Sequence, residues 1–79
     1  MWNMYVVYDR VAEESGPIFE AKNDGTAARA ARDLVASAKG AKAHEFQLLK
    51  LGTIDHEKNA ITPLLVPEDV HYMMQEEEL

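Results

Sequence analysis

The sequence predicts a small α+β domain: an antiparallel sheet of about four strands (β-β-α-β-β) with one packed helix and a short C-terminal helix. Two observations lead to this fold class. Short segments rich in aromatic and β-branched residues are separated by turn-forming residues, and one alanine-rich segment has helical spacing. A chain of 79 residues has room for one core. We expect residues 1–66 to form the α+β core domain, and residues 67–79 to form the short C-terminal helix and an acidic tail.

The first strand is expected at residues 2–9, which are rich in aromatic and β-branched side chains. Because successive side chains of a strand point to opposite faces, Tyr5 and Val7 share one face. The other face carries Trp2, Met4, Val6 and Tyr8. Two apolar faces indicate a central strand, or a strand whose second face meets a partner. A polar loop at residues 13–17 and a second short strand at residues 18–22, antiparallel to the first, are expected to follow.

The best-marked element is a helix that opens at Asn23-Asp24-Gly25, since Asn and Asp side chains accept hydrogen bonds from the first free N–H groups of a helix. Its buried stripe is expected to consist of Ala27, Ala31, Leu34, Val35 and Ala38. Lys39 lies in the expected last turn, where its charge suits the helix dipole, and Gly40 supplies the left-handed terminator. A stripe made mostly of alanine allows the helix to approach a sheet closely.

A third strand is expected at residues 44–54, a polar turn at residues 55–59 and a fourth strand at residues 60–66. In the third strand, one face carries Phe46 and Leu48, and the other carries Leu49 and Leu51. Pro63 interrupts the fourth strand, which points to an edge strand or to the end of a strand, because proline lacks the N–H that an interior strand needs.

The C-terminal segment is predicted to begin a short helix at Pro67, a residue suited to the first helical position. Glu68 and Asp69 then lie in its first turn, where negative charge suits the helix dipole. Residues 76–78 are three glutamates at the wrong end for that dipole, so we expect the tail to fray.

Composition and spacing argue against catalysis. The chain has no cysteine, which excludes disulfides, cysteine-based zinc sites and thiol catalysis. His-x-x-x-His, Gly-x-Ser-x-Gly and Gly-rich phosphate-loop spacings are missing from the sequence. We therefore expect no enzyme activity, no metal and no cofactor. Because a short chain without disulfides has a thin core, we expect a homo-oligomer.

Hydropathy and the first residues bear on location. No apolar run approaches the roughly 20 residues that a membrane span needs. The N-terminal residues lack the basic segment and the small-residue cleavage site of a secretory signal. We expect a cytoplasmic protein with no membrane partner.

The strongest functional hint is a basic middle between acidic ends. The net charge of −6 divides into −3 for residues 1–20, +3 for residues 21–50 and −6 for residues 51–79. Such asymmetry is one mark of a nucleic-acid-binding surface with an acidic tail. The candidate binding residues are Lys22, Arg29, Arg32, Lys39, Lys42 and Lys50. The alternative is that these side chains form only the solvated side of an amphipathic helix.

Aromatic residues on the strands give a second route to nucleic acid. Tyr5, Tyr8, Phe19 and Phe46 could stack on bases if the sheet were open on one face. The alternative is that a domain this small needs most of its aromatic rings in the core. The negative net charge works against phosphate contacts, so binding would use the basic side alone.

Four segments carry a resemblance to a known family: residues 4–9, 16–29, 46–55 and 61–64. Their most specific parts are the Phe-x-Ala-Lys-Asn-Asp-Gly motif at residues 19–25 and the Gly-x-x-Asp-x-x-x-x-x-Ile-Thr-Pro hairpin at residues 52–63. Over residues 4–66 the chain resembles the small non-structural protein of gokushovirus-type microviruses, which are tailless icosahedral phages with circular single-stranded DNA.

The resemblance implies a non-capsid protein of the host cytoplasm, of a family labelled DNA-binding or linked to the switch toward single-stranded genome synthesis. It carries over no catalytic residues. Lys22 and Arg29 are the basic residues inside the shared motif, and the other four candidates rest on charge placement.

Our first hypothesis is an accessory protein that binds single-stranded DNA in genome replication or packaging. The rival is a protein-interaction module, expected to be dimeric, that modulates a phage or host replication or assembly factor without binding DNA. A third hypothesis is an inhibitor whose acidic ends mimic DNA and bind a host protein.

Overall fold

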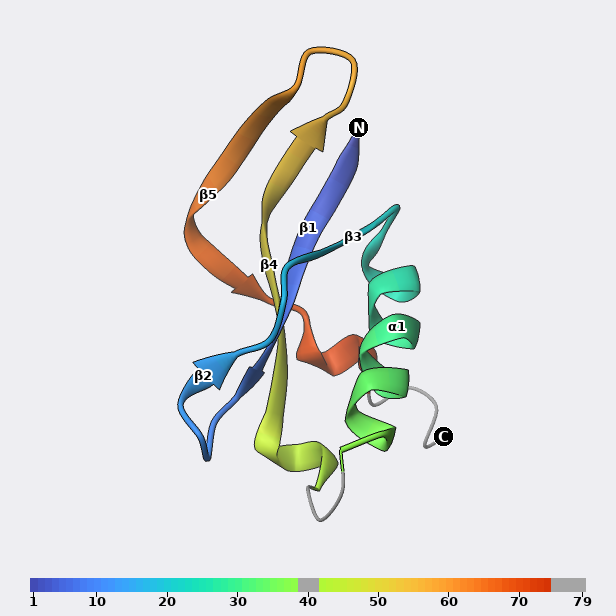
Figure 1. Ribbon diagram of the computed structural model, residues 1–79, viewed down its shortest axis with the longest axis vertical. Helices are drawn as coiled ribbons and strands as arrows, with labels where there is room; N and C mark the ends of the chain where they lie inside the picture. The colour runs from blue at the N-terminus through green and yellow to red at the C-terminus, as the bar shows by residue number, and fades with distance from the viewer. Residues whose placement is uncertain (39–41, 75–79) are drawn as a thin grey trace.

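The computed structural model describes residues 1–38 and 42–74, and it confirms the α+β class (Figure 1). A curled antiparallel sheet carries one α-helix. The elements are β1 (Trp2–Asp9), β2 (Glu14–Ser15), β3 (Phe19–Ala21), α1 (Asp24–Ala36), η1 (Ala43–Glu45), β4 (Phe46–Asp55), β5 (Ala60–Asp69) and η2 (His71–Met74), where η denotes a 3-10 helix.

The sheet has the strand order β2-β1-β4-β5, and β3 also pairs with β1. All pairs are antiparallel. β2 and β3 follow one another along the same edge of β1, where Tyr8 is opposite Ser15 and Tyr5 is opposite Phe19. β1 is thus the central strand that its two apolar faces predicted. The short strand β2 lies where the sequence predicted only a polar loop.

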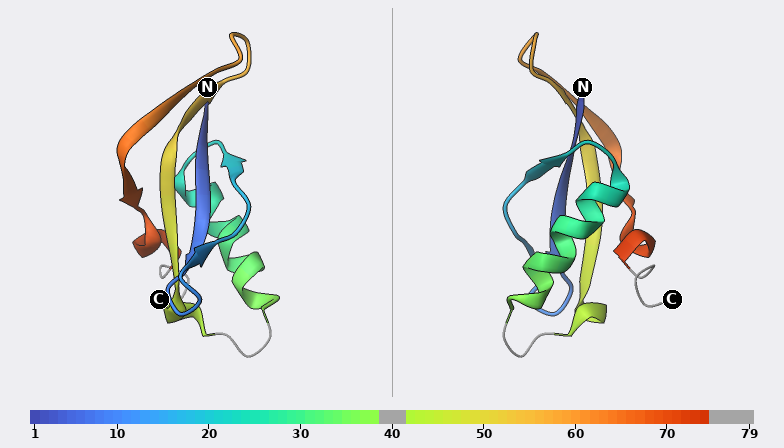
Figure 2. Two further views of the ribbon diagram at one scale, coloured as in Figure 1. Left: turned by 60° about the vertical axis from the view of Figure 1, so that its left-hand side comes forward. Right: turned by 90° about the vertical axis from the view of Figure 1, so that its right-hand side faces the viewer.

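A single layer of helices covers one face of the sheet (Figure 2). α1 crosses this face, and η2 packs beside α1 and β4. The core between the two layers contains Tyr5, Val7, Ala21, Ala27, Ala28, Ala31, Phe46, Leu48, Val70 and Met74. Three alanines are the buried residues of α1, so the helix lies close to the strands, as its composition predicted. Leu34 was expected in this stripe, but it is 50 % exposed and lines a groove beside the C-terminal half of α1.

The start of α1 follows from its cap. The Asn23 Oδ1 atom accepts hydrogen bonds from the Thr26 backbone N–H and from the Thr26 hydroxyl, each at 2.8 Å. The Asn23 carbonyl accepts the first helical bond from Ala27 at 3.0 Å. A capping asparagine satisfies N–H groups that the first helical turn leaves free. The helix ends at Ala36, and the predicted terminator residues Lys39 and Gly40 lie outside the described residues.

β4 begins at Phe46, two residues later than predicted, because His44 lies in η1. In the turn before β4, Lys42 and Glu45 are hydrogen-bonded to each other. The Lys42 N–H donates to the Glu45 side chain at 2.8 Å, and the Glu45 N–H donates to the Lys42 carbonyl at 2.9 Å. These reciprocal bonds favour a helical turn at this point over further strand pairing.

β5 continues to Asp69, so the prediction of a helix beginning at Pro67 is wrong. Glu68 pairs with Lys50 and Asp69 pairs with Leu49, which extends the strand beyond the proline. The last turn, η2, begins only at His71. The Asp69 carboxylate accepts the His71 N–H at 2.9 Å, and this bond holds the pKa of Asp69 below its usual value.

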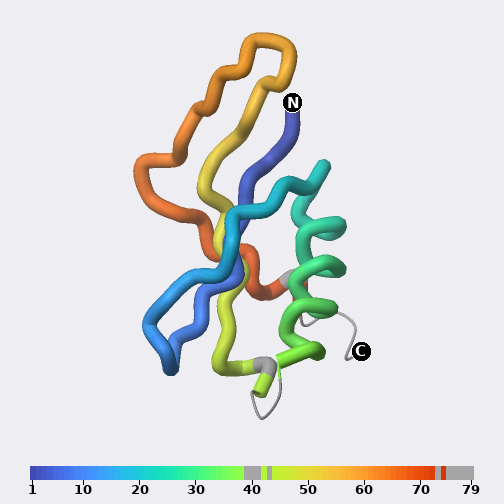
Figure 3. The backbone as a smooth tube through the Cα atoms, in the orientation of Figure 1, coloured from blue at the N-terminus to red at the C-terminus, as the bar shows by residue number. Residues whose placement is uncertain are grey.

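The β4–β5 pairing contains one large irregularity. Lys50 is opposite Glu68 and Gly52 is opposite Pro63, so the single residue Leu51 faces four residues of β5. β5 therefore bows away from β4 between these two points (Figure 3). A Cβ atom at Gly52 would lie 2.4 Å from the Thr62 carbonyl oxygen, so only glycine allows the strands to approach where the bow begins. β5 is also the edge strand that Pro63 predicted.

Candidate nucleic-acid interface

The predicted basic residues begin with three that lie at or on α1. Lys22 directly precedes the cap residue and is exposed, Arg29 is exposed on the helix, and Arg32 is half-buried. Arg29 and Arg32 are three positions apart, which places them on the same side of the helix. The structure therefore brings these three candidates to one element.

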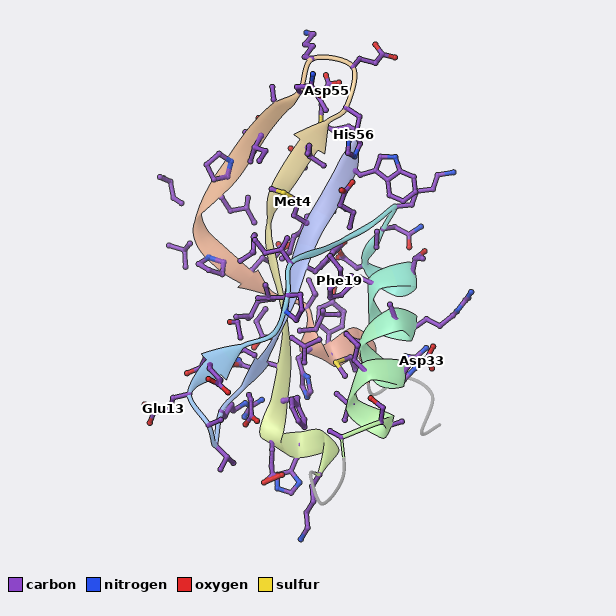
Figure 4. All side chains as sticks on the ribbon, in the orientation of Figure 1. Met4, Glu13, Phe19, Asp33, Asp55 and His56 are labelled. Carbon is purple, nitrogen blue, oxygen red and sulfur yellow. The ribbon has the colours of Figure 1, made fainter. Side chains whose placement is uncertain are left out.

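Acidic side chains interrupt this surface at two points, Asp24 in the first turn of α1 and Asp33 further along the helix. Asp33 points outward from α1, away from the sheet (Figure 4). The other acidic residues of the described chain are spread over the strands, η1 and the turns: Asp9, Glu13, Glu14, Glu20, Glu45, Asp55, Glu57, Glu68 and Asp69. At α1 the three candidate cations thus outnumber the two carboxylates by one.

Two further candidates, Lys42 and Lys50, lie on other parts of the fold. Lys42 directly precedes η1 in the sequence, and η1 lies at the end of the molecule away from the start of α1 (Figure 1). Lys50 lies on β4 between Tyr5 on β1 and Glu68 on β5, so it shares their face of the sheet. Lys39 lies outside the described residues.

A buried tyrosine is hydrogen-bonded to the first turn of α1. The Tyr5 hydroxyl donates to the Asp24 Oδ1 atom at 2.7 Å and accepts from the Asn3 side-chain N–H at 3.1 Å. Burial, followed by the bond to Asp24, raises the pKa of Tyr5 well above its ordinary value of 10.0. The carboxylate beside the helix N-terminus works against an anion binding there, which agrees with a capping role for this motif. The sequence signal for this contact is a tyrosine in a strand before an acidic helix start.

Three of the four aromatic rings considered for base stacking lie on the face of the sheet that α1 covers, which favours the alternative of a core role. Tyr5 is fully buried and Phe46 is 9 % exposed. Phe19 lies between the sheet and α1 (Figure 4), where its ring stacks on Tyr5 with the centroids 5.7 Å apart. The helix covers the face of the sheet that these rings occupy. Tyr8 lies on the opposite face and is half-buried.

A mostly apolar groove of about 250 Å³ runs between the C-terminal half of α1 and the segment that follows β2. It is lined by Val7, Asp9, Glu14, Ser15, Gly16, Pro17, Leu34, Val35 and Phe46. Two of the lining residues, Asp9 and Glu14, are carboxylates. The Asp9 Oδ1 atom accepts hydrogen bonds from the Val11 and Ala12 N–H groups in the turn after β1. The groove is therefore not a site for phosphate.

The three histidines lie in different elements. His44 is in η1, His71 is in η2, and His56 is in the β4–β5 turn with its Nε2 atom 2.5 Å from the Glu20 Oε1 atom. Over residues 1–38 and 42–74, no group of three or more His, Cys, Asp or Glu side chains could hold a metal ion. The described part of the chain also contains no helix that is long and apolar enough to cross a membrane.

Comparison with known proteins gives one match. The model of a family described as Phage ORF5 protein matches residues 2–76, which is nearly the whole chain. No curated protein and no solved structure matches the chain.

Proposed function

We propose that this chain, which belongs to the Phage ORF5 protein family, is a phage accessory protein. The activity that we propose for it is the binding of single-stranded DNA. The role would be in genome replication or packaging of a gokushovirus-type microvirus, in the host cytoplasm. The observation that supports the proposal best is that Lys22, Arg29 and Arg32 lie at the start and along the outside of α1.

The buried rings determine what kind of binding is proposed. Because Tyr5 and Phe46 are in the core, the contacts would be made to phosphates and not to bases. Such contacts are independent of sequence and are weakened steeply by salt. The net charge of −6 opposes the approach of DNA to the rest of the molecule, so the strand would run along α1 only.

The test is a titration of the full chain with labelled single-stranded DNA of mixed sequence, from low to moderate salt. Three phosphate contacts predict a slope of about −2 for the logarithm of the association constant against the logarithm of salt concentration, since each contact contributes roughly −0.7. We expect Arg29→Ala to weaken binding and to reduce this slope by about 0.7.

Lys58→Ala is the matched control. It removes one positive charge from the exposed β4–β5 turn, away from α1, and should leave the slope unchanged. No binding at low salt would contradict the proposal. An equal loss in the two variants would contradict the assignment to α1, because binding would then follow total charge.

A specific observation also favours the rival function of a protein-interaction module. Large apolar side chains of β5 are exposed, with Leu65 at 104 % and Val66 at 75 %. In phage that carry the mutated gene, DNA binding predicts that Arg29→Ala lowers phage yield more than Leu65→Lys. The rival predicts the reverse order.

A further inference from the structure

β5 carries a strip of exposed apolar side chains that the function proposed above does not use. We define the apolar strip as Ile61, Leu64, Leu65 and Val66, which are 58 %, 41 %, 104 % and 75 % exposed. These are four of the ten exposed large apolar side chains in the described chain, and they lie within six consecutive positions. Scattered apolar residues are common on surfaces, but a contiguous set of this kind marks an interaction surface.

The strip is exposed because of how β5 is built. The bow of β5 opposite Leu51 directs residues 64–67 away from β4. The close approach at Gly52, where a Cβ atom would lie 2.8 Å from the Pro63 Cα atom, fixes the point at which the bow begins. The exposure of Leu64, Leu65 and Val66 therefore follows from the strand register, whereas Ile61 pairs with Ile54 and is exposed on the paired part of this edge strand.

The absence of charge on the apolar strip favours a second copy of this chain as its partner. Residues 60–67 contain no charged side chain, in a chain with 22 charged residues and a net charge of −6. Two copies of an acidic protein repel one another except where their surfaces are uncharged. A two-fold contact also requires a surface that is complementary to itself, which an apolar strip is and a charged one is not. We propose that the apolar strip is the contact surface of a two-fold homodimer.

The flanks of the strip fit an antiparallel arrangement. Lys58 stands two positions before the uncharged run, and Asp69 stands two positions after it. An antiparallel approach of two copies brings Lys58 of each toward the Glu68–Asp69 end of the other. Lys58 then faces these carboxylates at both ends of the contact and its neighbour Glu57 lies beside it, whereas a parallel approach would bring the two Glu68–Asp69 ends together.

Side chains, and not a continuous sheet, form this contact. Pro63 and Pro67 lack the backbone N–H that a strand needs to pair with another strand. Prolines and a bulge on an edge strand both act against strand addition. The association therefore depends on the size and polarity of Leu65 and its neighbours. β5 and α1 lie on opposite sides of β4 (Figure 1), so a dimer formed here leaves α1 accessible.

A second copy would also compensate for a thin core. The largest fully buried side chains of the described chain are Tyr5, Leu48 and Val70. Domains of this size commonly gain stability by oligomerisation when they lack disulfides.

The test is the molecular mass of the full chain by analytical ultracentrifugation over about a hundredfold range of protein concentration. We expect a monomer–dimer equilibrium for the wild type, and a midpoint of thermal unfolding that rises with concentration because the dimer is favoured by mass action. Leu65→Lys should be monomeric over the same range. Because Leu65 is fully exposed in the single chain, this variant should keep the wild-type circular dichroism spectrum.

Val11→Lys is the matched control. It makes the same change of charge at an apolar residue that is 72 % exposed and lies outside the strip. It should dimerise as the wild type does. A wild type that is monomeric at all concentrations would overturn the proposal and assign the strip to a different partner. Dimerisation of Leu65→Lys with wild-type affinity would overturn the assignment of the surface.

Discussion

Leu48 and Leu65 are the same residue type on neighbouring strands, yet they differ completely in environment. Leu48 on β4 is 0 % exposed and Leu65 on β5 is 104 % exposed. The face of β4 that carries Leu48 is covered by α1 and η2, whereas the bow of β5 carries Leu65 away from the sheet. The comparison shows that hydrophobicity alone does not decide burial in this chain. What decides it is whether another element of the same chain lies opposite.

The two regions also differ in how they bear on function. The covered face uses the aromatic rings that could otherwise have contacted bases, and it orients α1 so that Arg29 faces solvent. The edge region has no covering element, and its exposed side chains are uncharged. The comparison therefore separates a polar helix surface, to which we assign DNA, from an apolar strand surface, to which we assign a second copy.

The largest effect is expected from truncating Leu48, and truncation of Leu65 is the comparison. Leu48→Ala should lower the free energy of unfolding by about 2–5 kcal/mol, because it removes buried methyl groups and leaves a cavity in the core. Leu65→Ala should change it by less than about 0.5 kcal/mol in the monomer. Urea unfolding at low protein concentration measures both values. Similar losses for the two variants would show that Leu65 is buried in the single chain.

A smaller loss of stability is expected when the buried hydroxyl of Tyr5 is removed. Tyr5→Phe removes the bond to Asp24 and should lower the free energy of unfolding by about 1.5–3 kcal/mol at neutral pH, as is usual for a bond to a charged group. Urea unfolding gives the value. A stability equal to that of the wild type would show that the hydroxyl contributes nothing to the folded state.

The same variant tests the raised pKa of Tyr5. The folded protein keeps the Tyr5 proton at a pH at which the unfolded chain, with the ordinary value of 10.0, has released it. The stabilisation from Tyr5 is therefore fully present below pH 10 and is lost as the pH rises above it. The difference between the wild type and Tyr5→Phe should shrink over that range in unfolding experiments at successive pH values.

Gly52→Ala tests the junction between the two regions, with an expected loss of about 1–3 kcal/mol from overpacking. The added Cβ atom would lie 2.4 Å from the Thr62 carbonyl oxygen, so β5 must move away from β4. Gly16→Ala is the control, since its Cβ atom would meet only the Val7 carbonyl oxygen, at 3.8 Å. Thermal unfolding of both variants measures the effect, and equal midpoints would refute the close approach.

Local sequence determined much of this fold. The bounds of β1, the cap of α1 at Asn23 and the edge position of β5 were all predicted, because strand periodicity, a capping side chain and the missing N–H of Pro63 each act within a few residues. The presence of basic residues inside and around the helix was also visible in the sequence. These properties require no knowledge of distant segments.

Tertiary structure decided which side chains are covered. The sequence could not show that Tyr5 is buried beneath the start of α1 or that Leu34 is exposed, because both depend on where the helix crosses the sheet. It could not show that β5 continues past Pro67, since the strand is held there by pairing with Lys50 and Leu49. The same pairing directs the apolar strip outward.

The candidate site divides in the same way. The sequence determined six candidate cations, and the structure brought three of them to α1 while it separated Lys42 and Lys50 from that group. A charge pattern along a chain records only which residues are present. Whether two charges act on one ligand depends on their distance in space, which is set by the packing of elements that are far apart in the sequence.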